Sequence, residues 1–269
     1  MSGNDVSDWW STAIIDMEPG RIRLRGHPIE ELIGKLTLPE TIWLMTRGEM
    51  PQDGQARLLE AALVAAVDHG PQAPSIAAAR MAVTCGLPLN NAMASAVNML
   101  GDVHGGAGEQ AVEFLDGIAK AASSGTGLAQ AASEGVDNWQ HARNAFVPGF
   151  GHRFHKPSDP RAPRLLSLVD KAGECGVVTG RYAHAGRAVE DELSRRKGKP
   201  VPMNIDGATA VIFAAPGVAP PLARGRISHS RSVGILAHAW EQMQQGGRNK
   251  GPTPPEYRWN YTGPDPNKR

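Results

Sequence analysis

Polar side chains that can move protons or bind anions are spread along the chain, each at the end of a predicted helix or in a turn. They are His69, His104, His152, Arg161, Asp206 and Arg231. Imidazole and carboxylate groups act as general acids and bases, and a guanidinium group binds a carboxylate through two parallel hydrogen bonds. These residue types suit a site that transfers protons and binds anions.

The densest polar group lies between residues 148 and 161. Gly149 and Gly151 allow a tight backbone turn that presents His152. The polar residues that follow are Arg153, His155, Lys156, Asp159 and Arg161. A histidine among fixed positive charges suits a site that holds polyanions, and the alternative is a polar surface turn.

The sequence lacks the motifs of metal sites, of GxSxG hydrolases and of CxxC thiol pairs. No histidine pair has metal-binding spacing such as HExxH, so we expect no metal. No GxSxG motif is present, and neither Cys85 nor Cys175 has a CxxC partner. We expect both cysteines to be buried structural residues.

The composition indicates a soluble globular protein. The 269 residues are 41% hydrophobic and 20% charged, and the net charge of +1 points to neither nucleic acid nor membrane partners. The two cysteines fit a reducing compartment, no apolar run is long enough to span a bilayer, and the first residues lack signal-peptide features. We therefore expect a cytoplasmic location.

Hydrophobic periodicity predicts a mainly α fold. A short N-terminal β-hairpin is predicted between residues 13 and 25, turning at Glu18–Gly20. Helices are predicted for residues 29–33, 38–47, 52–69, two within 74–100, 109–123, 128–138, further helices within 162–199, and 232–245. The helix 232–245 carries Val233, Leu236, Trp240 and Met243 on one face. The tail from Gly246 is rich in Gly, Pro and Asn and is expected to cover a neighbour or to be partly disordered.

Motifs in a fixed order along nearly the whole chain resemble the citrate synthase superfamily. The motifs are RGHPIEEL from Arg25, RGEMP from Arg47, DHGP around His69, HGGA from His104, GFGHR around His152, DPR ending at Arg161, NID ending at Asp206, and SRSVGILAH from Ser230. The resemblance implies a helical large domain, residues 1–161 and 200–269, and a small helical domain, residues 162–199, that closes over the substrate.

The number of residues between two of these motifs favours one branch of the superfamily. Full-length citrate synthases have a long helical stretch before the first catalytic histidine, whereas here a single helix separates Pro51 from His69. This shortened form resembles citryl-CoA lyase and the C-terminal lyase module of ATP-citrate lyase. The ATP-citrate lyase module has no histidine at the position of His104. In retaining this histidine, the chain is similar to citrate synthases.

The resemblance implies carbon–carbon cleavage or formation through an acyl-CoA enolate. The implied roles are His152 at the hydroxyl or carbonyl oxygen, His104 at the thioester oxygen, Asp206 at the carbon proton, His69 at the oxo-acid end, and Arg161 and Arg231 on substrate carboxylates. Arg153 and Lys156 are candidates for CoA phosphates. A tail arginine, Arg258 or alternatively Arg248, would enter the site of a neighbouring subunit, which implies a homodimer or larger homo-oligomer.

Several functions remain open from the sequence. The preferred one is a citryl-CoA lyase-like enzyme that forms acetyl-CoA and oxaloacetate, with a CoA thioester as substrate and no tightly bound cofactor. A separate ligase would have to make the thioester, because the chain has no ATP or biotin motif. The alternatives are a short citrate or 2-methylcitrate synthase, an enzyme for another 3-hydroxy-acyl-CoA, and an inactive CoA-binding homologue.

Overall fold

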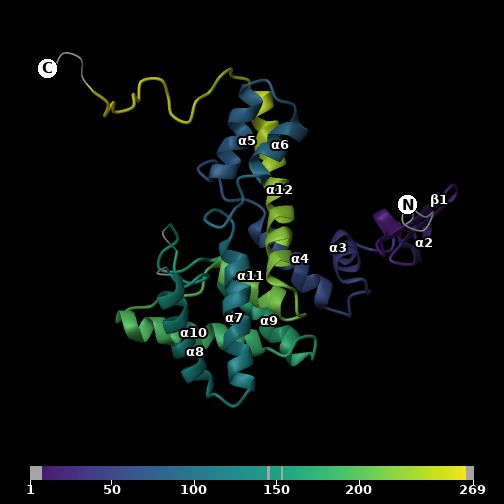
Figure 1. The fold of residues 1–269 in the computed structure, drawn as a ribbon, viewed down its shortest axis with the longest axis vertical. Coiled ribbons are helices and arrows are strands. Elements are labelled where there is room, and N and C mark those ends of the chain that lie inside the picture. Colours follow the sequence, from purple (N-terminus) through teal and green to yellow (C-terminus); the bar gives the residue numbers. More distant parts are fainter. Residues whose placement is uncertain (1–7, 144–145, 153, 265–269) are drawn as a thin grey trace. The chain divides into compact units, whose positions relative to one another are not determined.

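The structure is a computed structural model that describes residues 8–143, 146–152 and 154–264. The chain forms two compact units, each built from two segments. Unit 1 comprises residues 1–65 and 110–220, and unit 2 comprises residues 66–109 and 221–269. The mainly helical fold class is confirmed (Figure 1). The separation of residues 162–199 as a small domain stays a prediction.

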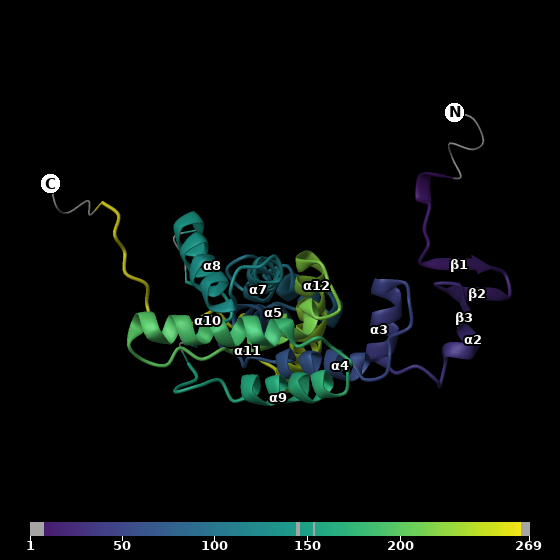
Figure 2. The ribbon, with the colours of Figure 1, turned by 90° about the horizontal axis from the view of Figure 1, so that it is seen from below.

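Unit 1 begins with a small antiparallel sheet in the order β1-β2-β3. After the 3₁₀ helix η1 (Asp8–Trp10), the strands are β1 (Ile15–Glu18), β2 (Arg21–Leu24) and β3 (His27–Pro28). The predicted hairpin is confirmed, with Gly20 at a φ of 77° in its turn. The third strand, labelled in Figure 2, was not predicted, because a two-residue strand gives no hydrophobic alternation.

The remaining elements of unit 1 are helices. They are α2 (Ile29–Leu32), α3 (Leu38–Arg47), α4 (Gln55–Ala66), α7 (Ala107–Ser123), α8 (Leu128–Arg143), α9 (Arg161–Glu174), α10 (Arg181–Lys197) and α11 (Ile205–Ala214), with the last residue of α4 and the start of α7 crossing the unit boundary. The predicted bounds of α3 are confirmed, because local signals define both ends. Thr37 and Glu40 form a capping box, and Gly48 closes the helix in the left-handed region.

Helix α11 supplies much of the core of unit 1. Every residue from Gly207 to Ala214 is buried, and α11 packs against α9 and α10 (Figure 2). A helix that is apolar on all sides is typical of a buried core element. The core therefore fixes the first helical turn of α11, which contains Asp206.

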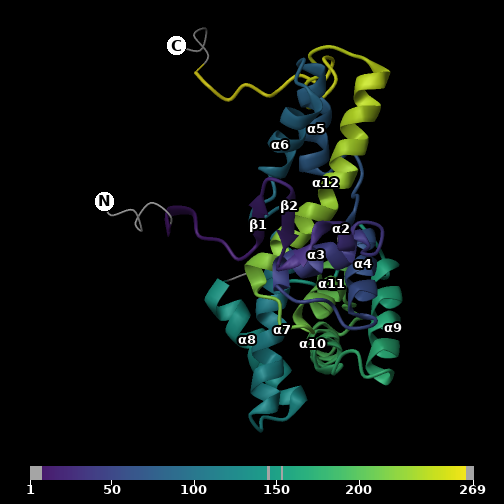
Figure 3. The same cartoon turned by 90° about the vertical axis from the view of Figure 1, so that its right-hand side faces the viewer.

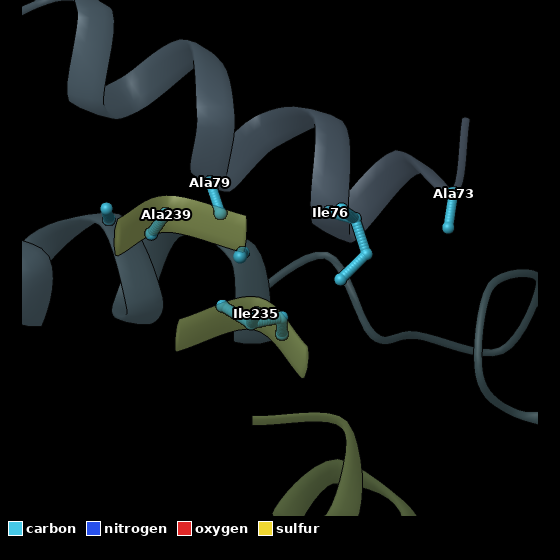
Figure 4. Close-up of a cluster of buried hydrophobic side chains, with 7 residues drawn as sticks. Ala73, Ile76, Ala79, Ile235 and Ala239 are labelled. Atoms are coloured by element: carbon cyan, nitrogen blue, oxygen red, sulfur yellow. The ribbon is translucent and has the colours of Figure 1, made fainter. Parts of the chain in front are cut away.

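Unit 2 is organised around one long helix. Its elements are α5 (Pro74–Thr84), α6 (Leu89–Val97) and α12 (Pro220–Gln245), of which α12 starts at the unit boundary. Figures 1 and 3 show α5 and α6 beside the C-terminal half of α12. Ile76, Ala79, Ile235 and Ala239 are all fully buried in the cluster that joins them (Figure 4), to which the buried Ala96 of α6 also belongs. The small side chains allow close helix approach, as the alanine content predicted.

The large apolar residues of α12 do not belong to this core. Val233, Leu236, Trp240 and Met243 are each at least 40% exposed, and the helix is buried instead along Gly234, Ile235 and Ala239. The spacing placed the four residues on one face but did not indicate that the opposite, small-residue face makes the contact.

The expected burial of both cysteines is wrong. Cys85 and Cys175 are exposed free thiols. Each is the C-cap residue of a helix, α5 and α9 respectively, where the chain leaves the packed face. None of the helices in the described part of the chain combines the length and hydropathy needed to cross a bilayer.

Candidate functional site

In unit 1, His152 lies at the end of a glycine turn. Gly149 and Gly151 have φ angles of 86° and 69°, as their predicted role requires. The Nδ1 atom of His152 accepts hydrogen bonds from the backbone N–H groups of Phe154, at 3.1 Å, and His155, at 2.9 Å. Because Nδ1 is an acceptor, the neutral ring carries its proton at Nε2.

The same turn is bonded to the segment that leads into α11. The N–H of Gly151 donates to Pro202 O at 2.7 Å, and the N–H of Asn204 donates to Gly149 O at 2.9 Å. The Asn204 amide group donates to Gly151 O at 2.6 Å, and its side-chain oxygen caps α11 by accepting from the N–H of Asp206. These bonds place His152 and Asp206, 54 positions apart, on two segments that are directly joined.

Two glycines allow this contact. A Cβ on Gly207 would lie 2.4 Å from Gly149 O, and a Cβ on Gly149 would lie 2.7 Å from Gly207 Cα. No other residue type fits at either position without movement of the backbone. The glycine pair, like the hydrogen bonds described above, therefore allows the turn that carries His152 to lie against the start of α11, where Asp206 lies.

Arg161, at the start of α9, is held by a buried carboxylate. Its Nε and one terminal nitrogen donate to the two oxygens of Asp159 at 2.9 and 2.8 Å. Asp159 is 1% exposed and also accepts from the N–H of Ile205 at 3.1 Å. Burial alone raises the pKa of Asp159, but the bonds from Arg161 and Ile205 outweigh it and lower the pKa to about 2. Asp159 thus links the starts of α9 and α11.

In unit 2, His104 faces the N-terminus of α5. Its Nε2 lies 2.9 Å from Ser75 Oγ and accepts from the N–H of Ser75 at 3.2 Å. A neutral ring then carries its proton at Nδ1, which makes no hydrogen bond to the residues that the structure describes. Burial, and then the positive charge of Arg231, lower the pKa of His104. His104 is therefore a neutral imidazole with an available N–H donor near pH 7.

His69 is exposed and lies beyond α4, which ends three residues before it rather than at it as predicted. The segment that carries His69 contacts α12 at three α12 positions, each about one helical turn from the next. Arg231 Nε donates to Ala66 O at 3.1 Å, Gly234 leaves room for Val67 O, and His238 Nε2 lies 3.2 Å from Asp68 Oδ1. The segment is therefore held by α12 at positions 231, 234 and 238.

Asp68 supports the turn that carries His69. Its Oδ2 accepts from the N–H of Gly70 at 3.1 Å. Burial raises the pKa of Asp68, but backbone hydrogen bonds from Gly70 and His69, together with His238, lower it below the usual value. Asp68 is thus an anion at neutral pH.

The other predicted residues lie apart from these contacts. Lys156, Arg248 and Arg258 are exposed, and Arg153 lies outside the described residues. The structure thus groups His152, Arg161 and Asp206 in unit 1, and His69, His104 and Arg231 in unit 2. Sequence reasoning assigned no positioning role to four residues that hold them: Ser75, Asp159, Asn204 and His238. For Asp159, the Asp-x-Arg spacing with Arg161 was an available signal.

In total, the two groups contain two hydrogen-bonding imidazoles with assigned tautomers, one carboxylate at a helix start and two guanidinium groups. Such groups can transfer a proton at an oxygen, stabilise charge on a second oxygen and transfer a proton at carbon. Among the described residues, no three His, Cys, Asp or Glu side chains are grouped as metal ligands.

Comparison with known proteins gives the family. The sequence profile "Citrate synthase, C-terminal domain" matches residues 45–252, most of the chain. The chain belongs to the citrate synthase family. Among curated relatives, the citrate synthase of Haloferax volcanii is 29% identical over 201 residues, which are 74% of this chain and 50% of the relative. The chain spans about half the length of the first curated relatives it matches.

Solved structures of two lyases resemble this one. The citryl-CoA lyase of Hydrogenobacter thermophilus is 31% identical, with a TM-score of 0.83 over 96% of both chains. The ATP citrate lyase of Methanothrix soehngenii, solved with citrate and coenzyme A, has a TM-score of 0.78 over 96% of this chain and 42% of that one. At 20% identity, the second likeness concerns the fold alone.

Proposed function

We propose that this chain is a carbon–carbon lyase that cleaves citryl-CoA, or a related 3-hydroxy-acyl-CoA, to acetyl-CoA and oxaloacetate. The observation that carries the proposal is the likeness to citryl-CoA lyase, which extends over 96% of both chains at 31% identity. In contrast, half of the length of the citrate synthases that it resembles in sequence is unmatched.

His152, His104 and Asp206 supply the three proton-handling groups of this reaction. The tertiary hydroxyl loses its proton to water, and the adjacent carbon–carbon bond breaks to leave a carbonyl whose oxygen accepts a hydrogen bond from Nε2–H of His152. The bond electrons pass to the thioester oxygen, which accepts a hydrogen bond from Nδ1–H of His104. Asp206 then protonates the enolate carbon to give the acetyl thioester. General acid–base catalysis contributes about 10²–10⁴-fold in such steps.

The tautomers support these roles. Two backbone N–H groups donate to Nδ1 of His152, so its neutral ring presents Nε2–H as a hydrogen-bond donor to the substrate oxygen. For His104, a neutral N–H donor can stabilise the enolate oxygen without giving up its proton.

The substrate's remaining charges are assigned to basic residues. We assign Arg161, Arg231 and His69 to the carboxylates, and Lys156 and Arg153 to the CoA phosphates. Asp159 already occupies two nitrogens of Arg161, so that residue would bind through its third nitrogen, which also donates to Ala65 O at 3.4 Å. The chain would use a CoA thioester as substrate without a tightly bound cofactor, and a separate ligase would supply it.

A second subunit is part of the proposal. Arg258 lies in an exposed tail between the exposed aromatic residues Tyr257 and Trp259. Exposed aromatic residues are enriched in protein interfaces. We assign Arg258 to the site of a neighbouring copy in a homodimer, whereas Arg248, the alternative, lines a cavity in unit 2. Sedimentation analysis should therefore show a dimer or larger oligomer, and a monomer would refute this arrangement.

Purified protein and citryl-CoA test the reaction, with oxaloacetate detected by a coupled reductase. Asp206→Ala should lower the rate about 10²-fold or more. Asp191→Asn is the matched control, because Asp191 is an exposed carboxylate on α10 whose loss should leave the rate within about twofold. Equal rates for both variants would contradict the role of Asp206.

A synthase is the second candidate, because the matched curated relatives are citrate synthases. It would condense acetyl-CoA with oxaloacetate and release free CoA and citrate. Release of free citrate from citryl-CoA would support it. No turnover of any 3-hydroxy-acyl-CoA would indicate a CoA-binding homologue without activity.

A further inference from the structure

Unit 2 contains a cavity of about 540 Å³ that the proposed reaction does not use. Its walls are one face of α5 with Pro71, residue Gln242 of α12, and the chain from Arg248 to Pro255. In Figures 1 and 3 this chain leaves α12 beside the end of α5. The volume is in the range of small-molecule sites, about 300–1,000 Å³.

The lining of the cavity is positively charged. Arg80, Arg248 and Lys250 are its charged members, and no carboxylate is among the lining residues. Neither the Arg248 guanidinium nor the Lys250 ammonium has an ion-pair partner in the described part of the chain. Met81 and several prolines supply apolar surface. A ligand that matches this lining carries negative charges on a partly apolar body.

The wall formed by the tail is fixed to the helices. The N–H groups of Asn249 and Lys250 donate to Thr84 O at 2.9 Å and Thr84 Oγ1 at 3.1 Å. Gln242, which is 2% exposed, donates to Gly246 O at 2.7 Å. The two basic side chains are therefore held on a backbone anchored at both α5 and α12.

Arg80 connects the cavity to the His69 segment. Its guanidinium lies 3.1 Å from Nδ1 of His238 and donates to Glu241 at 2.5 Å. Because an arginine can only donate, Nδ1 of His238 is an acceptor, and the neutral ring carries its proton at Nε2, toward Asp68. A continuous chain of contacts therefore runs from the cavity through Arg80, His238 and Asp68 to the turn that carries His69.

We propose that this cavity binds a small organic polyanion, and that its occupancy alters the His69 segment through Arg80, His238 and Asp68. An anion in the cavity competes for the Arg80 guanidinium with His238, Glu241 and Gln245, whose Oε1 accepts from Arg80 at 2.8 Å. When Arg80 turns to the ligand, His238 loses the donor that fixes its tautomer, and its contact with Asp68 is no longer enforced. The effect on substrate rests on the proposed function, whereas binding in the cavity does not.

Calorimetric titration tests the binding itself. The probes are inorganic pyrophosphate and benzene-1,2,4-tricarboxylate, which separate phosphate from carboxylate recognition. Wild-type protein should bind at least one probe, and the double variant Arg248→Glu, Lys250→Glu should bind it at least about tenfold more weakly. The control is Lys35→Glu, Arg57→Glu, an equal charge change at exposed positions in unit 1, which should retain wild-type affinity. Failure of both probes, or equal loss in both double variants, would overturn the site.

The coupling is tested by titrating oxaloacetate with and without the probe that binds. The probe should change the oxaloacetate affinity of wild-type protein by about fivefold or more, which lies within the usual range of coupling between sites. His238→Phe should still bind the probe but show no such change. An unchanged affinity in wild-type protein would overturn the coupling. Probe binding by a protein that binds no oxaloacetate would instead refute the proposed function and leave the cavity site intact.

Discussion

His104 depends on two neighbours that lie far from it in the sequence. Ser75 fixes its tautomer from 29 positions away, and Arg231 lowers its pKa from the long helix α12. The motif around His104 predicted a turn histidine and the family resemblance predicted its role. Neither indicated which ring nitrogen is the donor, because that depends on a backbone N–H at the start of another helix.

Substitution of His104 should therefore affect the reaction more than substitution of its partner. His104→Ala should lower the rate of citryl-CoA cleavage about 10²–10³-fold, because it removes the donor to the thioester oxygen. Ser75→Ala should lower it less than about tenfold, since the backbone N–H of Ser75 still donates to Nε2. Steady-state rates of the two variants provide the test, and an equal loss would contradict the tautomer assignment.

Asp159 should make stability depend on pH in the acid range. Its pKa is about 2 in the folded protein and 3.8 as an ordinary value, so the folded state favours the ionised form. The stabilisation is complete above pH 3.8 and is lost as pH falls through about 2, and it amounts to roughly 2 kcal/mol. Denaturant unfolding between pH 5 and pH 2 should show this loss in wild-type protein. It should be absent in Asp159→Asn, and an identical pH dependence in both would contradict it.

At the scale of elements, the sequence indicated the helices better than their faces. The predicted bounds of α3 are confirmed, whereas α12 was predicted to start 12 residues too late. The apolar stripe at Val233, Leu236 and Trp240 is exposed because α5 and α6 pack on the small residues of α12. Periodicity shows that a face exists, but tertiary packing decides which face is buried.

The contact between the His152 turn and α11 should be sensitive to a single methyl group. Gly207→Ala places a Cβ 2.4 Å from Gly149 O and should destabilise the protein by about 1–3 kcal/mol and reduce cleavage. Gly117→Ala is the matched control, because its Cβ on α7 meets nothing within 4 Å and should stabilise the helix by about 0.5–1 kcal/mol. Thermal unfolding measures both, and equal melting temperatures would contradict the close contact.

The contact between α12 and the His69 segment can be tested with a second matched pair of glycine variants. Gly234→Ala places a Cβ 2.3 Å from Val67 O and should displace the segment, weakening oxaloacetate binding about tenfold. Gly225→Ala, also on α12, has no atom within 4 Å of its Cβ and should bind as wild type does. Calorimetric titration of oxaloacetate checks both. Unchanged affinity in Gly234→Ala would remove His69 from the substrate-binding group.

At the scale of the whole molecule, the ordered motifs gave the family and the mainly helical fold, and both are confirmed. The predicted site residues fall into two groups, one in each unit, and each group is internally organised by contacts that the sequence did not reveal. Asp159, Asn204, Gly234 and His238 belong to these contacts. Gly234 and His238 lie far in the chain from the His69 segment that they hold, so no local pattern connects them with it. Asp159 and Asn204 lie two residues before Arg161 and Asp206, but their bonds to Ile205 and Gly151 join segments distant in the chain.

The central claim is cleavage through an enolate, and the most direct measurement follows the acetyl methyl group. Citryl-CoA is incubated with the protein in heavy water, and the products are analysed by mass spectrometry. Protonation of the enolate carbon by an exchangeable acid such as Asp206 predicts acetyl-CoA with one deuterium in its methyl group, formed in equal amount with oxaloacetate. Free citrate and CoA without acetyl-CoA would contradict the lyase proposal.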